Sequence, residues 1–362
     1  MPIQYVVPAR PLATTTFPAT SASSTARVVR SRAPLRLGLA GGGTDVSPFC
    51  DQFGGLVVNA TIDKYCYATI QERNDGEVHF IAADRGITQQ LHDSITLLPL
   101  HTAIYRRLCN DYDLRSPSLT LTTIAEAPPG SGLGSSSTLV VSALEAFREY
   151  FALPLSKYDI ATLSHSIERI DCNLTGGRQD QYAATFGGFN TMDFATSGAV
   201  IVNPLRLTPA VIHEFEASLV LFYTGIERSS AQIIDEQTTH ITHNHLDRIS
   251  ATLRLKDEAA AMKEALLSGD FHKVAEVIRA GWEAKRQLAD GITTPRIEQA
   301  FELALSHGAL AGKVSGAGGG GYIMFVVEPH RRPALTAALS ALDGRVEPAH
   351  FVQEGATAWR LT

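Results

Sequence analysis

A run of small residues placed directly before an apolar helical pattern is the feature that most constrains this chain. Residues 128–137 read Pro-Pro-Gly-Ser-Gly-Leu-Gly-Ser-Ser-Ser, and residues 138–151 then carry apolar side chains at helical spacing. Glycines permit positive φ and close backbone approach, so successive N–H groups can point at one anion. The following helix adds free N–H donors and the positive end of its dipole. The pattern favours a triphosphate-binding loop over a Gly/Ser linker.

A β-branched side chain at Gly132 is expected to fill the phosphate space of this loop. The hydroxyls at 135–137 are expected to bind phosphate oxygens or a magnesium ion. The residues predicted to contact the nucleotide are Pro129, Gly130, Ser131, Gly132, Leu133, Gly134, Ser135, Ser136 and Ser137.

Two known nucleotide-binding motifs do not account for the glycines of this chain. The string from Gly308 to Val314 has the wrong spacing for a P-loop and lacks its hydroxyl. Residues 316–321 match G-x-G-x-x-G, but a strand pattern, YIMFVV, follows where the dinucleotide motif requires a helix. A dehydrogenase is therefore not favoured.

The bulk properties are those of a globular protein with two domains of ordinary size. The chain has 362 residues, of which 44% are hydrophobic and 19% are charged. A formal net charge of -6 gives no support for a nucleic-acid partner. The four cysteines lack metal-type spacing and indicate reduced thiols in a cytoplasmic protein. No apolar stretch reaches the length of a membrane span.

Residues 1–26 are rich in Ser, Thr, Ala and Pro and contain no acid, so we interpret them as a flexible tail, with organellar targeting as the alternative. The rest of the chain mixes strands and helices without a strict βαβ repeat, which predicts two α+β domains joined near residues 195–205. Strands are expected at 28–40, 56–70, 78–81, 118–124, 219–223, 322–327 and 350–352. Helices are expected at 138–151, 158–170, 229–237, 246–268 and 272–288, with two more opening at Thr294-Pro295 and at Pro333.

Three small-residue loops, at 33–45, 128–137 and 313–321, resemble in order and separation those of the GHMP kinase superfamily. Segments 40–45, 176–190 and 224–229 resemble its D-glycero-D-manno-heptose 7-phosphate kinase branch, with the fucokinases and galactokinases as neighbours. The resemblance implies a ribosomal protein S5 domain 2-like N-terminal domain over 27–200 and a ferredoxin-like C-terminal domain over 201–362. It also implies that ATP binds between the two.

The resemblance assigns the catalytic groups. Asp180 matches the family's catalytic aspartate, which would orient the acceptor hydroxyl as a base or as an electrostatic anchor. Arg36 matches the arginine beside it, which would stabilise charge on the moving phosphoryl group. Ser136 and Glu168 match the magnesium ligands, and the alternative for Glu168 is a solvated helix carboxylate.

Substrate contacts are also carried over by motif position. Asp45 matches the carboxylate that binds sugar hydroxyls, and Gly42-Gly43 replaces the Glu-His of galactokinase, which widens the site. Arg228 is the candidate for an acceptor phosphate, with Arg178 competing and an ordinary surface arginine as the alternative. The expected substrate-binding residues are Gly42, Gly43, Thr44, Asp45, Gly177, Arg178, Arg228, Gly318 and Gly319.

These features together predict a cytoplasmic kinase that uses ATP and Mg²⁺. It would phosphorylate the anomeric hydroxyl of D-glycero-D-manno-heptose 7-phosphate. Its partners would be a sugar phosphate and ATP, with neither nucleic acid nor membrane, and the oligomeric state stays open. The alternatives are a kinase of a free sugar such as L-fucose or another hexose, and a non-catalytic sugar and ATP sensor. A decarboxylase of the mevalonate branch is disfavoured.

Lys64 could reach a ligand or sit in a surface ion pair.

Overall fold

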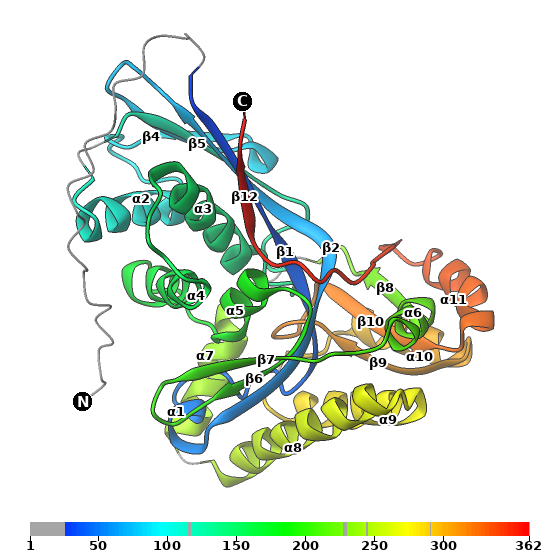
Figure 1. Cartoon of the computed structure of the whole chain (residues 1–362). Coiled ribbons are helices and arrows are strands. Elements are labelled where there is room, and N and C mark those ends of the chain that lie inside the picture. The colour runs from blue at the N-terminus through cyan, green and yellow to red at the C-terminus, as the bar shows by residue number, and fades with distance from the viewer. Residues whose placement is uncertain (1–25, 115–116, 227–229, 244, 290, 362) are drawn as a thin grey trace.

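The structure is a computed structural model that describes residues 26–114, 117–226, 230–243, 245–289 and 291–361 (Figure 1). The predicted tail over 1–26 therefore lies, except for residue 26, outside the described residues. No helix of the described ranges is long and apolar enough to cross a membrane.

The strands form two sheets. Their bounds are β1 (Val28–Ala40), β2 (Gly55–Glu72), β3 (Val78–Ala82), β4 (Ile87–Gln90), β5 (Leu119–Ala125), β6 (Phe189–Phe194), β7 (Val200–Pro204), β8 (Leu219–Tyr223), β9 (Ala309–Val314), β10 (Tyr322–Val327), β11 (Arg345–Glu347) and β12 (Thr357–Arg360). Within the described residues the large sheet runs β12-β1-β2-β5-β3-β4, with β6 paired to β2 and β7 to β6. The small sheet runs β11-β8-β10-β9.

The helices are distributed between the two sheets. Their bounds are α1 (Phe49–Phe53), α2 (Pro99–Asp111), α3 (Ser135–Phe151), α4 (Lys157–Ser166), α5 (Gln179–Phe186), α6 (Pro209–Ser218), α7 (Ser230–Thr242), α8 (Leu246–Ser268), α9 (Phe271–Arg286), α10 (Pro295–Ser306) and α11 (Arg332–Leu339). A π-helical turn at Ile167–Asp171 continues α4.

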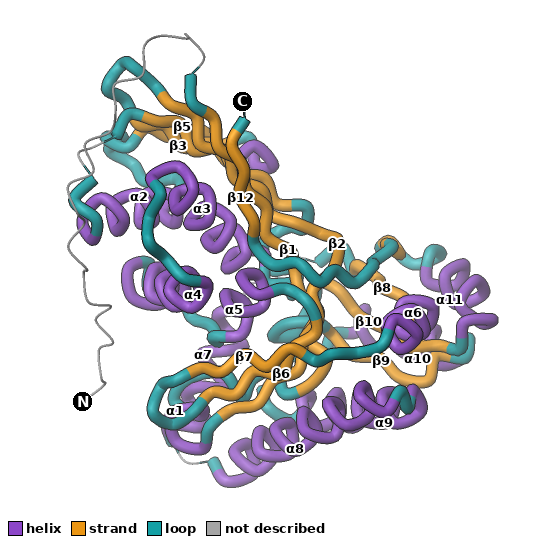
Figure 2. The backbone as a smooth tube through the Cα atoms, in the orientation of Figure 1, coloured by secondary structure: helices purple, strands orange, loops and turns teal. Residues whose placement is uncertain are grey.

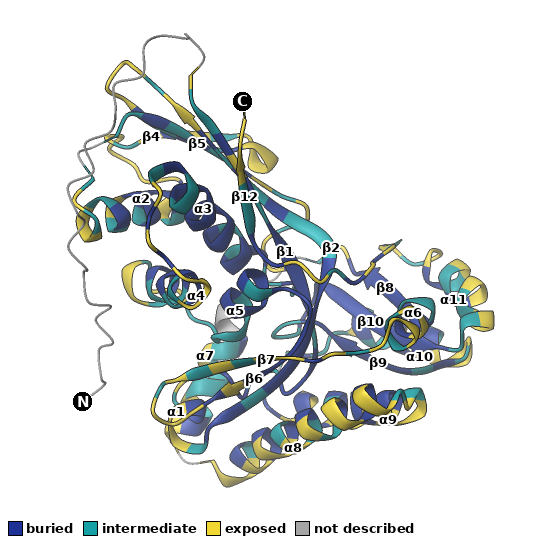
Figure 3. Cartoon of the chain, in the orientation of Figure 1, coloured by how far each residue is buried: buried dark blue, intermediate teal, exposed yellow. Residues whose placement is uncertain are grey.

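Helices α2, α3, α4 and α5 lie on the same side of the large sheet, and α8 and α9 run beneath both sheets (Figures 1 and 2). Strands β1 and β2 and helix α3 are buried along most of their length, whereas α8 and α9 expose one face (Figure 3). One apolar core joins Leu37 and Ala60 of the large sheet, Met262 and Ile278 of these two helices, and Met324 of the small sheet. Because this core is shared, the two sheets hold a fixed relation across the cavity described below.

The predicted fold class is confirmed, and strands 219–223 and 322–327 and helix 246–268 have their predicted bounds. The strand predicted at 350–352 is wrong, because there only Phe351 forms an isolated bridge, to Ile62. The Val352 N–H donates to the Thr61 carbonyl of β2 at 3.0 Å, but His350 donates to the Asp63 carboxylate at 2.8 Å and Phe351 to the Glu216 carboxylate at 2.7 Å. The chain then continues to β12, which pairs with β1. The division of domains at residues 200–201 stays a prediction.

Candidate active site

The second and third glycine-rich loops, at 128–137 and 313–321, contact each other through their backbones. Ser315 Oγ donates to the Gly132 carbonyl at 2.8 Å, and the Tyr322 N–H donates to the Ser131 carbonyl at 2.9 Å. Gly132 has φ +84°, and a Cβ there would lie 2.3 Å from the Ser315 carbonyl oxygen. The expectation that a side chain at Gly132 would fill the phosphate space is therefore wrong. Glycine is required because the two loops touch at this point.

A cavity of about 530 Å³ lies where these loops meet the first loop and α5. This volume is in the range of sites for small molecules. The predicted residues that line it are Arg36, Gly42, Gly43, Asp45, Pro129, Gly130, Gly132, Gly134, Ser135, Ser136, Ser137, Glu168, Gly177 and Asp180. Ser131 and Leu133 are buried behind it.

The first turn of α3 opens into this cavity. Gly134 precedes the helix in the left-handed conformation, with φ +79°, and no side chain caps the helix. The N–H groups of a first turn have no partner inside a helix, and α3 is 17 residues long, so its dipole adds positive potential there. Ser135, Ser136 and Ser137 line the same surface. The arrangement fits the oxygens of a nucleotide phosphate chain.

The two predicted catalytic residues form an ion pair. Arg36 comes from β1 and Asp180 from the first turn of α5, and the Arg36 Nη2 atom lies 2.6 Å from Asp180 Oδ1. Arg36 Nε donates to the same oxygen at 2.7 Å, and Nη1 donates to the Gly132 carbonyl. One guanidinium therefore fixes the carboxylate against the second loop. A charged pair of this kind beside a phosphate site can orient a hydroxyl and offset developing negative charge.

The predicted metal ligands also lie together. Ser136 Oγ donates to Glu168 Oε1 at 3.0 Å, and Gln181 Nε2 donates to the other carboxylate oxygen. Glu168 is 1% exposed, so the alternative of a solvated helix carboxylate is wrong. The π-helical turn places this carboxylate toward α3. A carboxylate and a hydroxyl are hard oxygen ligands of the type that Mg²⁺ accepts, so the residues present fit this ion.

Asp45 holds the first loop to the start of α5. Its carboxylate accepts from the backbone N–H groups of Gly43 (3.2 Å), Arg178 (2.9 Å) and Gln179 (3.0 Å), and from Gln179 Nε2 (3.1 Å). A Cβ at Gly177 would lie 2.0 Å from Asp45 Oδ2. Asp45 lines the cavity at only 1% exposure, and its contact with sugar hydroxyls stays a prediction.

Several predicted substrate residues lie outside the lining of the cavity. The Arg178 guanidinium donates to Ser47 Oγ at 3.0 Å and pairs with Asp51 at 2.8 Å. Arg228 lies outside the described residues. Thr44 is fully buried, with its hydroxyl bonded to the backbone.

Gly318 and Gly319 pack against Ile292 rather than face the cavity. The Gly319 N–H donates to the Ile292 carbonyl at 2.7 Å. Their substrate-binding role stays a prediction. Lys64, the residue left open above, pairs with Glu347 at 2.5 Å.

Sequence reasoning missed two buried lysines of the cavity wall. Lys285 lies on α9, and Lys313 is the penultimate residue of β9, at the start of the third loop. Burial and then the charge of Arg36 lower the pKa of Lys285 to about 8. Burial and then the charge of Lys285 lower the pKa of Lys313 to about 7. The one available signal was that Lys285 falls on the apolar face of its helix, at i+3 from the buried Trp282.

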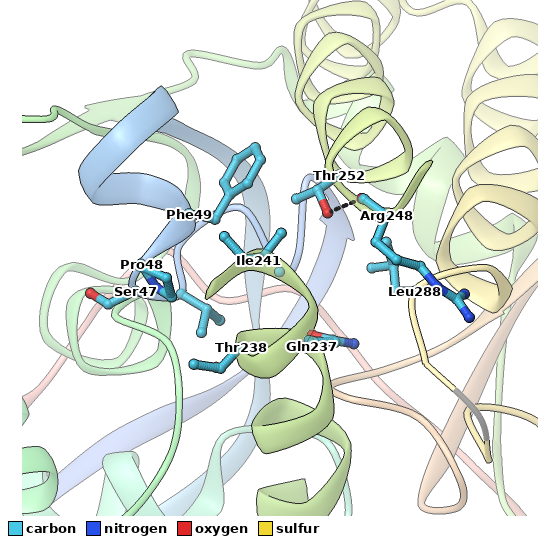
Figure 4. A pocket seen from close by; sticks show the side chains of 11 residues that line it. Ser47, Pro48, Phe49, Gln237, Thr238, Ile241, Arg248, Thr252 and Leu288 are labelled. Atoms are coloured by element: carbon cyan, nitrogen blue, oxygen red, sulfur yellow. Dashed lines mark hydrogen bonds between the residues drawn. The ribbon is translucent and has the colours of Figure 1, made fainter. Parts of the chain in front are cut away.

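A side pocket of about 20 Å³ adjoins the cavity at Gly43, Val46 and Gln237 (Figure 4). Phe49 of α1 and Ile241 of α7 are among its apolar lining residues. This volume is close to that of a single water molecule, so the pocket does not hold a sugar.

A helix start that opens into a cavity, an arginine–aspartate pair and two hard oxygen donors around it are the arrangement expected of a small-molecule kinase. The chain belongs to the GHMP kinases: the model of the family's N-terminal domain matches residues 99–188, and that of its C-terminal domain matches residues 262–342.

Among its relatives is the D-glycero-alpha-D-manno-heptose 7-phosphate kinase of Campylobacter jejuni, 39% identical over 92% of this chain and 100% of that protein. A similar solved structure is a D-glycero-D-manno-heptose 1-phosphate kinase from Bacteroides thetaiotaomicron, with TM-score 0.78 and 43% identity over 92% and 99% of the two chains. The galactokinase of Lactococcus lactis, at 17% identity and TM-score 0.72 over 92% and 95%, shares the fold.

Proposed function

We propose that this enzyme transfers the γ-phosphoryl group of ATP to the anomeric hydroxyl of D-glycero-D-manno-heptose 7-phosphate, giving the 1,7-bisphosphate. The observation that best supports phosphoryl transfer is the Arg36–Asp180 ion pair, which lies at the cavity wall beside the second loop. The names of the two similar heptose-phosphate kinases support a phosphorylated heptose as acceptor. Gly42 and Gly43 line the cavity, and a Cβ on either would reach side chains only at 3.8 Å or more: Gln179 for Gly42, and Leu288 and Gln237 for Gly43.

In this reaction the sugar hydroxyl oxygen forms a bond to the γ-phosphorus while the bond from that phosphorus to the bridging oxygen of ADP breaks. Asp180 orients the hydroxyl and accepts its proton. Arg36 holds the Asp180 carboxylate in place and offsets charge on the moving group. The first turn of α3 binds the phosphates that stay with ADP. Asp45 keeps the start of α5, and so Asp180, in register with the first loop.

Magnesium would be held by Ser136 and Glu168, where it would neutralise phosphate charge. Gln181 fixes the Glu168 carboxylate from the second side, so the ligand oxygens are oriented before the ion binds. We place the reaction in the cytoplasm, the compartment that supplies ATP.

The phosphate carried by the sugar needs a cation to bind it, and the sequence offers two candidates, Arg178 and Arg228. The guanidinium of Arg178 is already paired with Asp51, and Arg228, which lies outside the described residues, stays the first candidate from the sequence. Arg228→Ala is expected to raise KM for the sugar phosphate by about 10–100-fold with little effect on KM for ATP. An equal loss for a free sugar would remove Arg228 from recognition of the phosphate.

The test is ADP release measured with heptose 7-phosphate, unphosphorylated heptose, L-fucose and galactose side by side. We expect kcat/KM for heptose 7-phosphate to exceed that of each free sugar by at least about 10-fold, the worth of one charge-assisted contact. A higher value for L-fucose or another hexose would favour the free-sugar alternative. Binding of sugar and ATP without turnover would favour the sensor.

A further inference from the structure

Two lysines are buried at the wall of the active-site cavity, between the first and third glycine-rich loops. Lys285 is 6% exposed and Lys313 is 7% exposed. The Lys285 Nζ donates to the Gly316 carbonyl, and the Lys313 Nζ donates to the Leu39 carbonyl at 3.1 Å. Both side chains line the cavity of about 530 Å³. Neither lysine is part of the chemistry assigned above.

Neither ammonium group has an ion-pair partner among the described residues. No Asp or Glu oxygen of the described ranges lies within 4.0 Å of either Nζ atom. The carboxylates that favour their charged forms are more distant: Asp45 for Lys285 and Glu258 for Lys313. Arg36 adds a third positive charge beside them. Buried cations are costly when only neutral carbonyls compensate them, and an anionic ligand would remove that cost.

The contacts of Lys285 indicate which anion it would bind. Its ammonium group bonds to Gly316, and a Cβ on Gly316 would lie 2.6 Å from the Gly132 Cα. The Gly132 carbonyl in turn accepts from Arg36, which binds Asp180. Lys285 and Arg36 therefore flank the same point of contact between the second and third loops. A phosphoryl group that moves from the start of α3 to an acceptor at Asp180 passes this point.

We propose that Lys285 binds the transferring phosphoryl group and shares with Arg36 the stabilisation of its negative charge. Lys285 would be the second cation at the phosphoryl group, after Arg36, and its burial on α9 holds it in place. The proposal rests on the proposed kinase reaction and adds a residue to it. The positive charge of Lys285 in turn lowers the pKa of Lys313, which donates to the Leu39 carbonyl.

The test has a readout other than turnover. With a pKa of about 8, Lys285 is about half protonated at pH 8 in the free enzyme, and a bound anion will complete its protonation. Calorimetric titration in two buffers of different ionisation enthalpy measures this uptake. We expect the non-hydrolysable analogue AMPPNP with Mg²⁺ to draw about 0.5 proton more into the wild type than into Lys285→Met. ADP should show no such difference.

Comparison with the variant cancels the proton exchange of the nucleotide itself. In turnover assays Lys285→Met is expected to lower kcat by about 10²–10³-fold, the scale of one preorganised charge-stabilising donor. Lys273→Met is the matched control, because Lys273 lies on the same helix but is exposed and paired with Glu276. It should leave kcat and proton uptake unchanged.

Three outcomes would overturn the proposal. The first is equal proton uptake by wild type and variant with AMPPNP. The second is uptake on heptose 7-phosphate alone, which would assign Lys285 to the acceptor's own phosphate. The third is a variant that unfolds at lower temperature and loses ADP and AMPPNP binding equally, which would show that Lys285 only anchors the third loop. If the wild type released no ADP with any sugar, the proposed function would be contradicted instead. The calorimetric test of Lys285 uses AMPPNP and does not depend on turnover, so the two failures can be told apart.

Discussion

The Arg36 guanidinium and the Asp180 carboxylate meet at 2.6 Å although 144 residues separate them in sequence. Arg36 lies on β1 and Asp180 in the first turn of α5, so the pair joins the large sheet to a helix at the wall of the cavity. Its second contact, to the Gly132 carbonyl, links the pair to the second loop. The chemistry, the phosphate site and the loop geometry are therefore coupled through a single side chain.

Asp180→Asn should lower kcat by about 10² or more while the affinity for AMPPNP stays near that of the wild type, because an amide cannot accept the hydroxyl proton. Stopped-assay kinetics and calorimetry measure the two quantities. Asp193→Asn is the control, since Asp193 is exposed on β6 and its carboxylate bonds only to Asn203 among the described residues. Near-normal kcat in Asp180→Asn would exclude this carboxylate as a proton acceptor.

Gly134→Ala should impair turnover through Asp180. A Cβ at Gly134 would lie 3.1 Å from the Asp180 Cγ atom, and the residue has φ +79°. The expected loss is at least about 10-fold in kcat, since small displacements of a catalytic group are costly. Gly198→Ala carries the same backbone penalty at φ +86° with open space around its Cβ. An equal loss of stability in both variants with normal kcat in Gly134→Ala would show that Asp180 tolerates the methyl group.

Glu168→Gln should raise the Mg²⁺ concentration needed for half-maximal activity by about 10-fold or more, because one charged ligand is lost while Ser136 remains. Activity at saturating Mg²⁺ should recover in part. Glu145→Gln provides a buried control on α3, where Glu145 pairs with Arg148 away from the cavity. If both variants had the wild-type Mg²⁺ requirement, Glu168 would not be a ligand.

Lys313→Met should stabilise the unliganded protein, and more so at neutral than at alkaline pH. The folded-state pKa of Lys313 is lowered to about 7, from an ordinary value of 10.5 in the unfolded chain. Between these values the unfolded state binds more protons, so the stability of the wild type rises with pH through this group. The variant lacks this rise, so its advantage should be larger at pH 7 than at pH 9.5. Denaturant unfolding of both proteins at the two pH values measures it, and an advantage that grows with pH would contradict the assignment.

The sequence could predict the residues that act through a local motif. The chemistry of the loop at 128–134 and of the helix start behind it is visible in the residue types themselves, whereas Asp180 and Glu168 were assigned through the resemblance to the GHMP kinases. Strands such as β10 were also predictable, because a continuous apolar run followed the third loop.

The sequence could not predict contacts that depend on how distant elements pack. Lys285 resembles any helix lysine until α9 is placed against the third loop, and the contact with Ser315 that requires a glycine at position 132 is not visible in the sequence. The segment at 350–352 has strand-forming residues, yet the carboxylates of Asp63 and Glu216 accept from the N–H groups of His350 and Phe351. In each case the deciding partner is far away in sequence.

The most direct test of the central claim is the position of the new phosphate in the product. Heptose 7-phosphate, ATP and Mg²⁺ are incubated with the enzyme, and the purified product is examined by mass spectrometry and by ¹H–³¹P correlation spectroscopy. We predict a heptose with two phosphates, one of which couples to the anomeric proton. A new phosphate coupled to any other proton, or an unchanged monophosphate beside a phosphorylated free sugar, would contradict the account.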